Sequence, residues 1–531
     1  MMDEFTLADL TPVLLLGTIV LLVSVAAVRL STRSGLPSLL LYLAIGLVLG
    51  DAGLGIRFDS AQLTQVLGYV ALILILSEGG LTTRWSSIRR SVAPAAVLST
   101  VGVAVSIATV AAAAHVVLGL DWQLALLLGA ILSSTDAAAV FSVLRRVPLP
   151  RRLSGMLEAE SGFNDAPVVL MVTAFATQIA TGHAEPWWML LLITALELAG
   201  GAAVGLAIGF GVGWVARRVA AGSSALFALG ISATTILAYA VAASVHTSGF
   251  LACYLAALVL GNVNLPHAQA ATGLATALGW LAQIGLFIML GLLASPAGFP
   301  AQIGPALVLG AVLLLLARPL SVVVSLLPFR MGWRDQAFLS WAGLRGAVPV
   351  VLATVPMTTG HSSMRWIFDL VFVLVVVFTA VQAPTLPYVA RLLGLEEKHH
   401  TLGLNVDTTP LDELHADLLQ VTVGPDSRIG GVRVVELRLP HGANVALVVR
   451  DGAATVPQPN TVLRHGDDLL IVTTSQARDA AEKRVRAVSL GGRLAGWRSA
   501  PTPRRFASEL PPGIPPEPMS APPAPAPDLD S

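Results

Sequence analysis

Glu160-Ser161-Gly162-Phe163-Asn164-Asp165 places two carboxylates, a hydroxyl and an amide directly before the apolar run at 166–175. Ionisable groups at membrane depth are costly, so they usually mark an ion path or a proton relay. A helix end with solvated acids is the alternative, since Arg151 and Arg152 lie shortly upstream. The stretch therefore predicts a polar site inside a membrane-spanning chain.

Composition supports a multi-pass membrane protein in contact with a lipid bilayer. Of 531 residues, 55% are hydrophobic and 12% are charged, whereas soluble domains carry about 25% charged residues. The formal net charge is zero, so we expect no nucleic acid partner. The single Cys253 excludes an internal disulfide framework. The acidic start of the chain is unlike a signal peptide.

Apolar runs broken by charge, glycine and proline predict about thirteen membrane-spanning helices of roughly 20 residues each. Their expected positions are 11–29, 36–50, 65–82, 92–119, 122–144, 155–181, 187–215, 223–245, 247–263, 273–294, 302–327, 335–357 and 365–391. Several of these spans are rich in Gly and Ala, which lets helix backbones approach closely. The fold class is therefore an all-α polytopic membrane protein, followed by a smaller C-terminal part.

Basic residues set the expected orientation, because cytoplasmic loops carry the excess of Lys and Arg. Alternate loops, beginning after the first span, hold Arg29, Arg33, Arg84, Arg89, Arg90, Arg145, Arg146, Arg151, Arg152, Arg217, Arg218, Arg330 and Arg334. The opposite loops hold Arg57 and Arg365. We therefore expect the N-terminus outside, the C-terminus in the cytoplasm, and the chain in the inner membrane.

Two expected spans contain residues that interrupt a helix. The fifth contains Ser133-Ser134-Thr135-Asp136, whose side chains compete for backbone groups. The twelfth contains Gly343-Leu344-Arg345-Gly346-Ala347-Val348-Pro349. Discontinuous helices at matching places in two halves of a transporter point to its binding site. This placement suggests two inverted six-helix repeats, with the seventh span as a connector.

These polar segments offer hard oxygen ligands that suit a small monovalent cation. The candidate cation and proton ligands are Asp165, Asn164, Glu160, Ser161, Thr135 and Asp136. A carboxylate that binds either a cation or a proton exchanges one for the other by competition for one site. Ser161 and Asp165 are four residues apart and share a helix face.

Other charged groups have more than one reading. Asp136 is either a ligand or a helix cap, and Glu158, one residue off the shared face, is expected to be a bystander. Arg318 and Arg345 both fall inside expected spans. Glu78 either forms a buried ion pair with Arg345 or is an interfacial acid. Arg345 is either part of a special backbone site or a side chain that snorkels to the interface.

Three motifs in this order resemble the signature of bacterial cation:proton antiporters of the NhaP-like family, within the sodium/proton exchanger superfamily. They are residues 133–141, 160–165 and 343–349, and the resemblance covers residues 10–393. It implies a homodimer with a mobile core domain and elevator-like alternating access.

The resemblance also implies roles for individual residues. Asp165 would be the shared cation and proton carrier. Glu160, Ser161 and Thr135 would complete or order a potassium or sodium site around it. Asp136 would act through water, and Arg345 would pair with a core acid.

Two details of the motifs bear on stoichiometry and selectivity. Electrogenic relatives have two adjacent acids where this chain has Asn164-Asp165, which implies electroneutral exchange. The stretch that follows Thr135-Asp136 looks like the potassium/proton branch associated with cell volume regulation. Ala137 departs from the common Thr-Asp-Pro pattern, and Ala166-Pro167 also departs slightly from that branch.

The C-terminal part has a different composition. Residues 410–485 alternate apolar and polar positions, which predicts short strands in a small α+β domain. The segment 427–472 resembles a TrkA-C domain. Such domains regulate potassium transporters and channels, usually as dimers, and some bind cyclic dinucleotides; a purely structural cap is the alternative. We place an exchanger domain at 1–395, this domain at 408–486, and a Pro-rich tail, expected to be disordered, at 499–531.

Together these features predict an electroneutral potassium/proton antiporter that is not an enzyme, has no resident cofactor, and serves cation and pH homeostasis or cell volume regulation. A sodium/proton antiporter of the same family is the alternative. A TrkA-C-regulated potassium channel is less favoured, because no Thr-Val-Gly-Tyr-Gly-like filter sequence occurs.

Overall fold

The computed structural model describes residues 7–34, 37–51, 53–56, 58–136, 140, 149–183, 185–218, 223–359, 364–395, 408–411, 416–424, 427–450, 453–474 and 477–495. The expected Pro-rich tail at 499–531, Ala137 and the Arg145–Arg146 loop lie outside these residues. The chain divides into two compact units, Met1–Lys398 and His399–Ser531.

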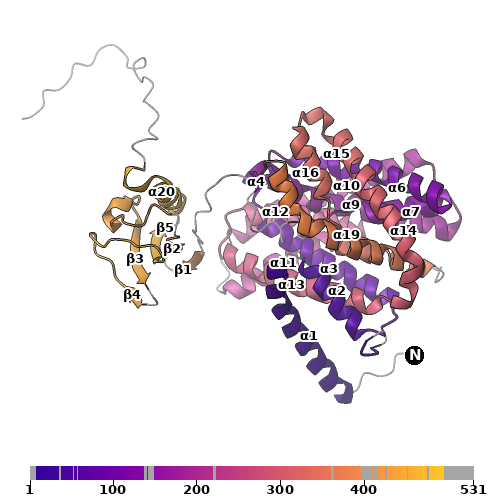
Figure 1. Ribbon diagram of the computed structural model, residues 1–531, viewed down its shortest axis with the longest axis horizontal. Coiled ribbons are helices and arrows are strands. Elements are labelled where there is room, and N and C mark those ends of the chain that lie inside the picture. The colour runs from indigo at the N-terminus through magenta and orange to yellow at the C-terminus, as the bar shows by residue number, and fades with distance from the viewer. Residues whose placement is uncertain are drawn as a thin grey trace, which may run out of the picture. The chain divides into compact units, whose positions relative to one another are not determined.

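Every secondary-structure element among the described residues of the first unit is a helix (Figure 1). Its elements are α1 (Leu7–Ser34), α2 (Ser38–Leu49), α3 (Ala61–Thr82), α4 (Trp85–Ile88), α5 (Val92–Val97), η1 (Leu98–Gly102), α6 (Val103–Leu118), α7 (Trp122–Ser133), α9 (Arg151–Thr181), α10 (Trp187–Ala216), α11 (Ser224–Ser244), α12 (Gly249–Asn262), α13 (Ala268–Leu293), η2 (Pro296–Gly298), α14 (Phe299–Val312), η3 (Leu313–Ala317), α15 (Arg318–Leu326), η4 (Leu327–Phe329), α16 (Trp333–Trp341), α17 (Ala347–Leu352), α18 (Val355–Thr358) and α19 (Arg365–Leu392).

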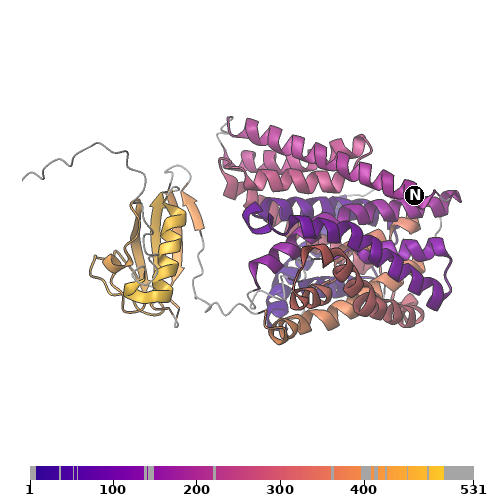
Figure 2. The same ribbon diagram turned by 90° about the horizontal axis from the view of Figure 1, so that it is seen from above.

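These elements follow the expected spans in order. Within the described residues, 8 helical segments are long and apolar enough to cross a membrane, and shorter apolar helices lie between them. Figure 2 shows the long helices running side by side. The all-α multi-pass fold is therefore confirmed, whereas the count of thirteen spans and the two inverted repeats stay predictions.

Both expected interruptions are present. Helix α7 ends at Ser133, and Ser134 is extended with φ −65° and ψ 144°. The Ser133 hydroxyl donates to the Ala130 carbonyl at 2.8 Å, which is the backbone competition expected of such side chains. Helix α16 ends at Trp341, and α17 begins only after Gly346, whose φ of −112° and ψ of −141° are not helical.

Close packing by small residues holds the long helices together. Helix α10 buries Gly201, Gly205, Gly209 and Gly213, four residues apart, against α12. A Cβ at Gly201 or Gly205 would overlap backbone atoms of Ser248 or Ala252. Helices α12 and α13 in turn pack against α3. In lipid the hydrophobic effect does not bring helices together. Small side chains stabilise the packing instead, because they allow close van der Waals contact.

The second unit is a small α+β domain. Its strands are β1 (Thr408–Leu411), β2 (Ala416–Thr422), β3 (Ala443–Arg450), β4 (Ala453–Thr455) and β5 (Asp468–Thr474), in the order β1-β2-β5-β3-β4 with antiparallel neighbours. Two short helices, η7 (Val434–Leu437) and η8 (Gly492–Leu494), and the longer α20 (Arg478–Gly491) complete it. Val485 of α20 joins Leu469 and Ile471 in the buried core. The predicted α+β fold is confirmed.

Candidate functional site

The two interrupted segments meet at their breaks. The Asp136 N–H donates to the Leu344 carbonyl at 2.8 Å. The last carbonyls of a helix have no intrahelical donor, and Arg345 Nε donates to one of them, that of Leu132 in α7, at 3.0 Å. Arg345 Nη1 also donates to the Gly343 carbonyl at 2.6 Å. The buried Arg345 therefore fastens one break to the other.

Gly346 lets the Asp136 carboxylate lie against the start of α17. A Cβ at position 346 would overlap the Asp136 carboxylate carbon and oxygen. No larger residue fits this point without moving the carboxylate or the backbone. The close approach of the two chain segments therefore depends on the absence of a side chain here.

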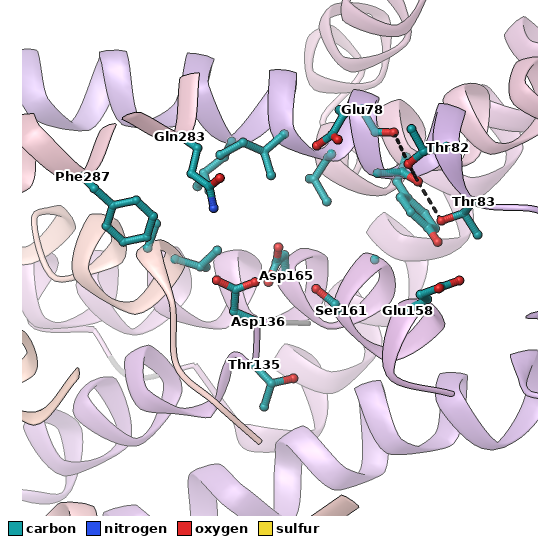
Figure 3. Close-up of a pocket in the computed structure, with 18 residues that line it drawn as sticks. Glu78, Thr82, Thr83, Thr135, Asp136, Glu158, Ser161, Asp165, Gln283 and Phe287 are labelled. Carbon is teal, nitrogen blue, oxygen red and sulfur yellow. Dashed lines mark hydrogen bonds between the residues drawn. The ribbon is translucent and has the colours of Figure 1, made fainter. Parts of the chain in front are cut away.

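Asp165 lies on α9 beside this crossing and is 7% exposed. The Ser134 hydroxyl donates to Asp165 Oδ1 at 2.8 Å. One turn earlier on the same helix, Ser161 lines the same cavity as Asp165 (Figure 3). The broken end of α7 and the intact α9 thus converge on one buried carboxyl group.

Glu160 points elsewhere and is held by Arg318. Arg318 Nη1 donates to Glu160 Oε1 at 2.6 Å and Nη2 donates to Oε2 at 2.8 Å, with both side chains buried. Thr135 Oγ1 also donates to Glu160 Oε1, at 3.0 Å. Glu160 is not among the residues that line the cavity. No partner for Arg318 was predicted from the sequence, although an arginine inside an apolar span was the available signal.

Asn164 completes this buried network. Its Nδ2 donates to Thr135 Oγ1 at 2.6 Å and to the Thr135 carbonyl at 3.3 Å. Its Oδ1 is buried and has no hydrogen-bond partner among the described residues. Arg318, Glu160, Thr135 and Asn164 form one chain of contacts that fixes the extended segment after α7. Asn164 and Glu160 therefore position Thr135 rather than face the cavity.

The expected ion pair between Glu78 and Arg345 is not formed. Arg345 donates to backbone carbonyls instead, and Glu78 lies in the cavity wall on α3. The arginine that pairs with a core acid is Arg318. It lies on α15, which packs against η1, and η1 packs against α9, the helix that carries Glu160. Of the two readings of Glu78 that the sequence left open, the ion pair with Arg345 is therefore wrong.

The cavity has a volume of about 450 Å³ and lies between α3 and α13 on one side and α9 and α17 on the other (Figure 3). Its polar lining residues are Glu78, Thr82, Thr83, Thr135, Asp136, Glu158, Ser161, Asp165, Tyr254 and Gln283. None of the described residues in its wall is Lys, Arg or His. A cleft lined by one sign of charge raises the local concentration of the opposite ion.

Glu158 belongs to this wall, contrary to expectation. The sequence placed Glu158 one residue off the face of Ser161 and Asp165, but all three residues line the cavity. Residues 158, 161 and 165 are three and four apart, which is the spacing of one helix face. The predicted placement of Glu158 off this face is therefore wrong, whereas its role as a bystander stays a prediction.

Two family descriptions match the chain. "Sodium/hydrogen exchanger, transmembrane" matches residues 19–392, and "TrkA-C domain" matches residues 418–486. The first covers the helical unit and the second covers most of the sheet domain.

Known proteins resemble nearly the whole chain. The K⁺/H⁺ antiporter NhaP of Alkalimonas amylolytica is 37% identical over 471 residues, covering 87% of this chain and 80% of the relative. The K⁺/H⁺ antiporter NhaP2 of Shewanella oneidensis is 34% identical over 474 residues, covering 88% of this chain and 82% of the relative. The solved structure of the sodium proton antiporter MjNhaP1 from Methanocaldococcus jannaschii matches with a TM-score of 0.63 at 20% identity, covering 72% of this chain and 99% of that one.

Proposed function

The chain belongs to the sodium/hydrogen exchanger family, and from that premise we propose that it exchanges potassium for protons, one for one, by alternating access. The observation that carries the proposal is the buried Asp165 carboxyl group at the crossing of two interrupted helices, facing an acidic cavity. Such a carboxyl group holds either a cation or a proton. The protein is therefore a transporter and not an enzyme.

The charge arrangement supports electroneutral exchange. Glu160 is matched by Arg318, so the pair adds no net charge to the site. Asn164 next to Asp165 is neutral. Asp165 is then the single buried carboxylate whose charge changes when a cation replaces a proton. Because one positive charge enters for each positive charge that leaves, the membrane potential does not affect the exchange equilibrium.

The ligand set around the cation is proposed to consist of cavity-lining oxygens. Asp165, Ser161 and Thr135 line the cavity and supply carboxylate, hydroxyl and backbone oxygen. Asp136 borders the same space and would act through water. Glu160 and Asn164 would act on the site through Thr135, which both contact.

Potassium is preferred over sodium in this proposal for two reasons. The relatives that match nearly the whole chain are named K⁺/H⁺ antiporters. The C-terminal unit matches the TrkA-C domain, a class associated with potassium-handling systems. A cyclic dinucleotide or another nucleotide is a candidate ligand of that domain. The proposed cellular role is cation and pH homeostasis or cell volume regulation.

The assembly and orientation are also proposed. The exposed face of α10 is apolar and carries Trp187 at one end and Trp214 at the other, with Gly residues buried behind it. We propose a homodimer in the inner membrane, with the N-terminus outside and the C-terminus in the cytoplasm. The arginines that precede α4 and begin α9 would then lie at the cytoplasmic surface.

A cation panel in everted vesicles tests the proposed exchange. Full-length protein should dissipate a preformed pH gradient on addition of potassium, and Asp165→Asn should abolish this while the protein still folds. A response to sodium but not potassium would select the sodium/proton alternative. No response to potassium, sodium or lithium across roughly pH 6–9 would contradict antiport altogether, and a voltage-dependent current would favour a channel.

A further inference from the structure

Part of the cavity lies beyond the residues that the proposed exchange uses. On α9, Glu158 lies two turns from Asp165, which is about 10 Å along the helix axis. Thr82 is exposed, Glu158 is partly exposed and Asp165 is buried. Along the cavity, Thr82 and Glu158 lie at one partly exposed end, Asp165 lies near the middle, and Gln283 and Phe287 lie at the other end (Figure 3).

A buried tyrosine hydroxyl group lies along this stretch of the cavity. Tyr254 of α12 is 2% exposed and lines the cavity, with its hydroxyl beside the Thr83 side chain. An ideal Cβ at Gly162 would lie 2.6 Å from that oxygen, so the hydroxyl rests on α9 one turn from Glu158. The Tyr254 hydroxyl accepts no hydrogen bond among the described residues, so its oxygen keeps lone pairs that a cation can contact.

Two threonine hydroxyls add oxygen lone pairs at the same place. Thr82 Oγ1 donates to the Glu78 carbonyl at 2.8 Å, and Thr83 Oγ1 donates to the Gly79 carbonyl at 2.7 Å. Because each hydroxyl donates its hydrogen bond to a backbone carbonyl of α3, its lone pairs remain available to a positive ligand. Carboxylate and hydroxyl oxygens are ligands that suit hard cations.

We propose that Glu158 and the Tyr254 hydroxyl form a vestibule site, which holds a monovalent alkali cation before it moves one step inward to Asp165. Glu158 supplies the charge, and Tyr254 supplies a hydroxyl oxygen with free lone pairs. The inference rests on the proposed exchange at Asp165 and adds a second, earlier stop on the same path. Loss of the vestibule site lowers occupancy at low cation concentration and leaves the carrier itself intact.

Potassium dependence of exchange in everted vesicles tests the site. Glu158→Gln and Tyr254→Phe should each raise the apparent KM for potassium by about tenfold, the lower end of the range by which an acidic cleft concentrates cations, with little change in maximal rate. Because the two groups share one cation, the double variant should be no worse than the more impaired single variant. Glu197→Gln is the matched control, since Glu197 is also partly exposed but lies on α10, away from the cavity.

A wild-type KM in Tyr254→Phe, together with a Glu158→Gln effect that disappears when choline chloride raises the ionic strength, would overturn the site. Such a result would mean that Glu158 acts only as a distant charge. A wild-type KM in both variants would also overturn it.

A binding measurement separates this inference from the exchange itself. In purified full-length Asp165→Asn, potassium chloride should still raise the melting temperature relative to choline chloride, and adding Glu158→Gln should remove that difference. Equal potassium dependence with and without Glu158→Gln would contradict the vestibule site. Vesicles without wild-type exchange would contradict the proposed function, whereas the melting experiment would still decide this site.

Discussion

Arg318 and Glu160, 158 residues apart in sequence, form a buried bidentate ion pair with N–O distances of 2.6 and 2.8 Å. The pair is connected to the extended segment after α7 because Thr135 donates to the same carboxylate. A planar guanidinium donates two parallel hydrogen bonds to a carboxylate, which fixes the relative orientation of the two groups as well as their distance. The charge pair therefore orients the backbone next to Asp165 without facing the cavity.

Breaking this pair should destabilise the protein strongly. Arg318→Gln leaves a buried carboxylate uncompensated, which costs about 3–5 kcal/mol, and should lower the melting temperature of the purified protein. Glu160→Gln with Arg318→Gln should recover part of the loss, because no unpaired charge remains. Additive losses in the double variant would show that the pair does not interact as described.

Arg345 and Glu78 should behave as independent residues. A lysine at position 345 cannot donate to the Leu132 and Gly343 carbonyls in the two directions that the guanidinium does. Arg345→Lys should therefore reduce the free energy of unfolding by about 1–3 kcal/mol. When Arg345→Lys is combined with Glu78→Gln, the two losses in the free energy of unfolding should add within about 0.5 kcal/mol. The cycle of Arg318 and Glu160 is the positive control. A coupling comparable to that control would restore the ion pair expected from sequence.

Gly346→Ala should abolish exchange. The new methyl group would occupy the space of the Asp136 carboxylate, and overpacking of this kind costs about 1–3 kcal/mol. Gly285→Ala on α13 is the control, because nothing lies within 4 Å of a Cβ there. Exchange rates in vesicles, with folded protein quantified by gel filtration, measure both. Normal exchange by Gly346→Ala would mean that the crossing tolerates a wider separation.

Asn164→Asp should make exchange sensitive to membrane potential. The substitution adds a second carboxylate beside Asp165, so a further proton can move without a compensating cation. One uncompensated charge corresponds to about 2.3 kcal/mol per 100 mV. Rates are compared at one fixed potassium gradient with and without valinomycin, which sets the membrane potential to the value of that gradient. Asn164→Ala removes the amide without adding a charge and should stay insensitive; equal insensitivity of both variants would argue against the charge count.

In the C-terminal domain, Asp467 should make stability depend on pH. Burial would raise the pKa of Asp467, but hydrogen bonds from Arg450 at 2.8 Å and from the Arg464 N–H at 2.7 Å, with the charges of both arginines, lower it below the usual value. A depressed folded pKa contributes stability above the unfolded value of about 3.9, and this stability is lost as pH falls through the folded value.

Hydrogen exchange of β5 in the intact protein measures this effect. Asp467→Asn should reduce protection at pH 7 by about 1–3 kcal/mol, and the difference from wild type should shrink as the pH falls below about 4. Asp479→Asn, at the exposed start of α20, is the control. A difference that stays constant with pH would show that the Asp467 charge is not responsible.

The sequence by itself determined the local features of this protein. Apolar runs located the helices because membrane spans need continuous hydrophobic length. Small polar residues after Ser133 and glycines around Arg345 located the two interruptions, because each acts on its own backbone. Ser161 and Asp165 were correctly placed on one face, and the same helical spacing would have placed Glu158 there too.

Only the tertiary structure decided which distant groups meet. Two arginines lay in apolar spans, and nothing local distinguishes the one that pairs with Glu160 from the one that binds the α7 carbonyl. The cavity likewise depends on α3 and α13 facing α9, which no single segment specifies. Helix periodicity fixes which side chains share a face, but ion pairs and cavities depend on how those faces are brought together in three dimensions.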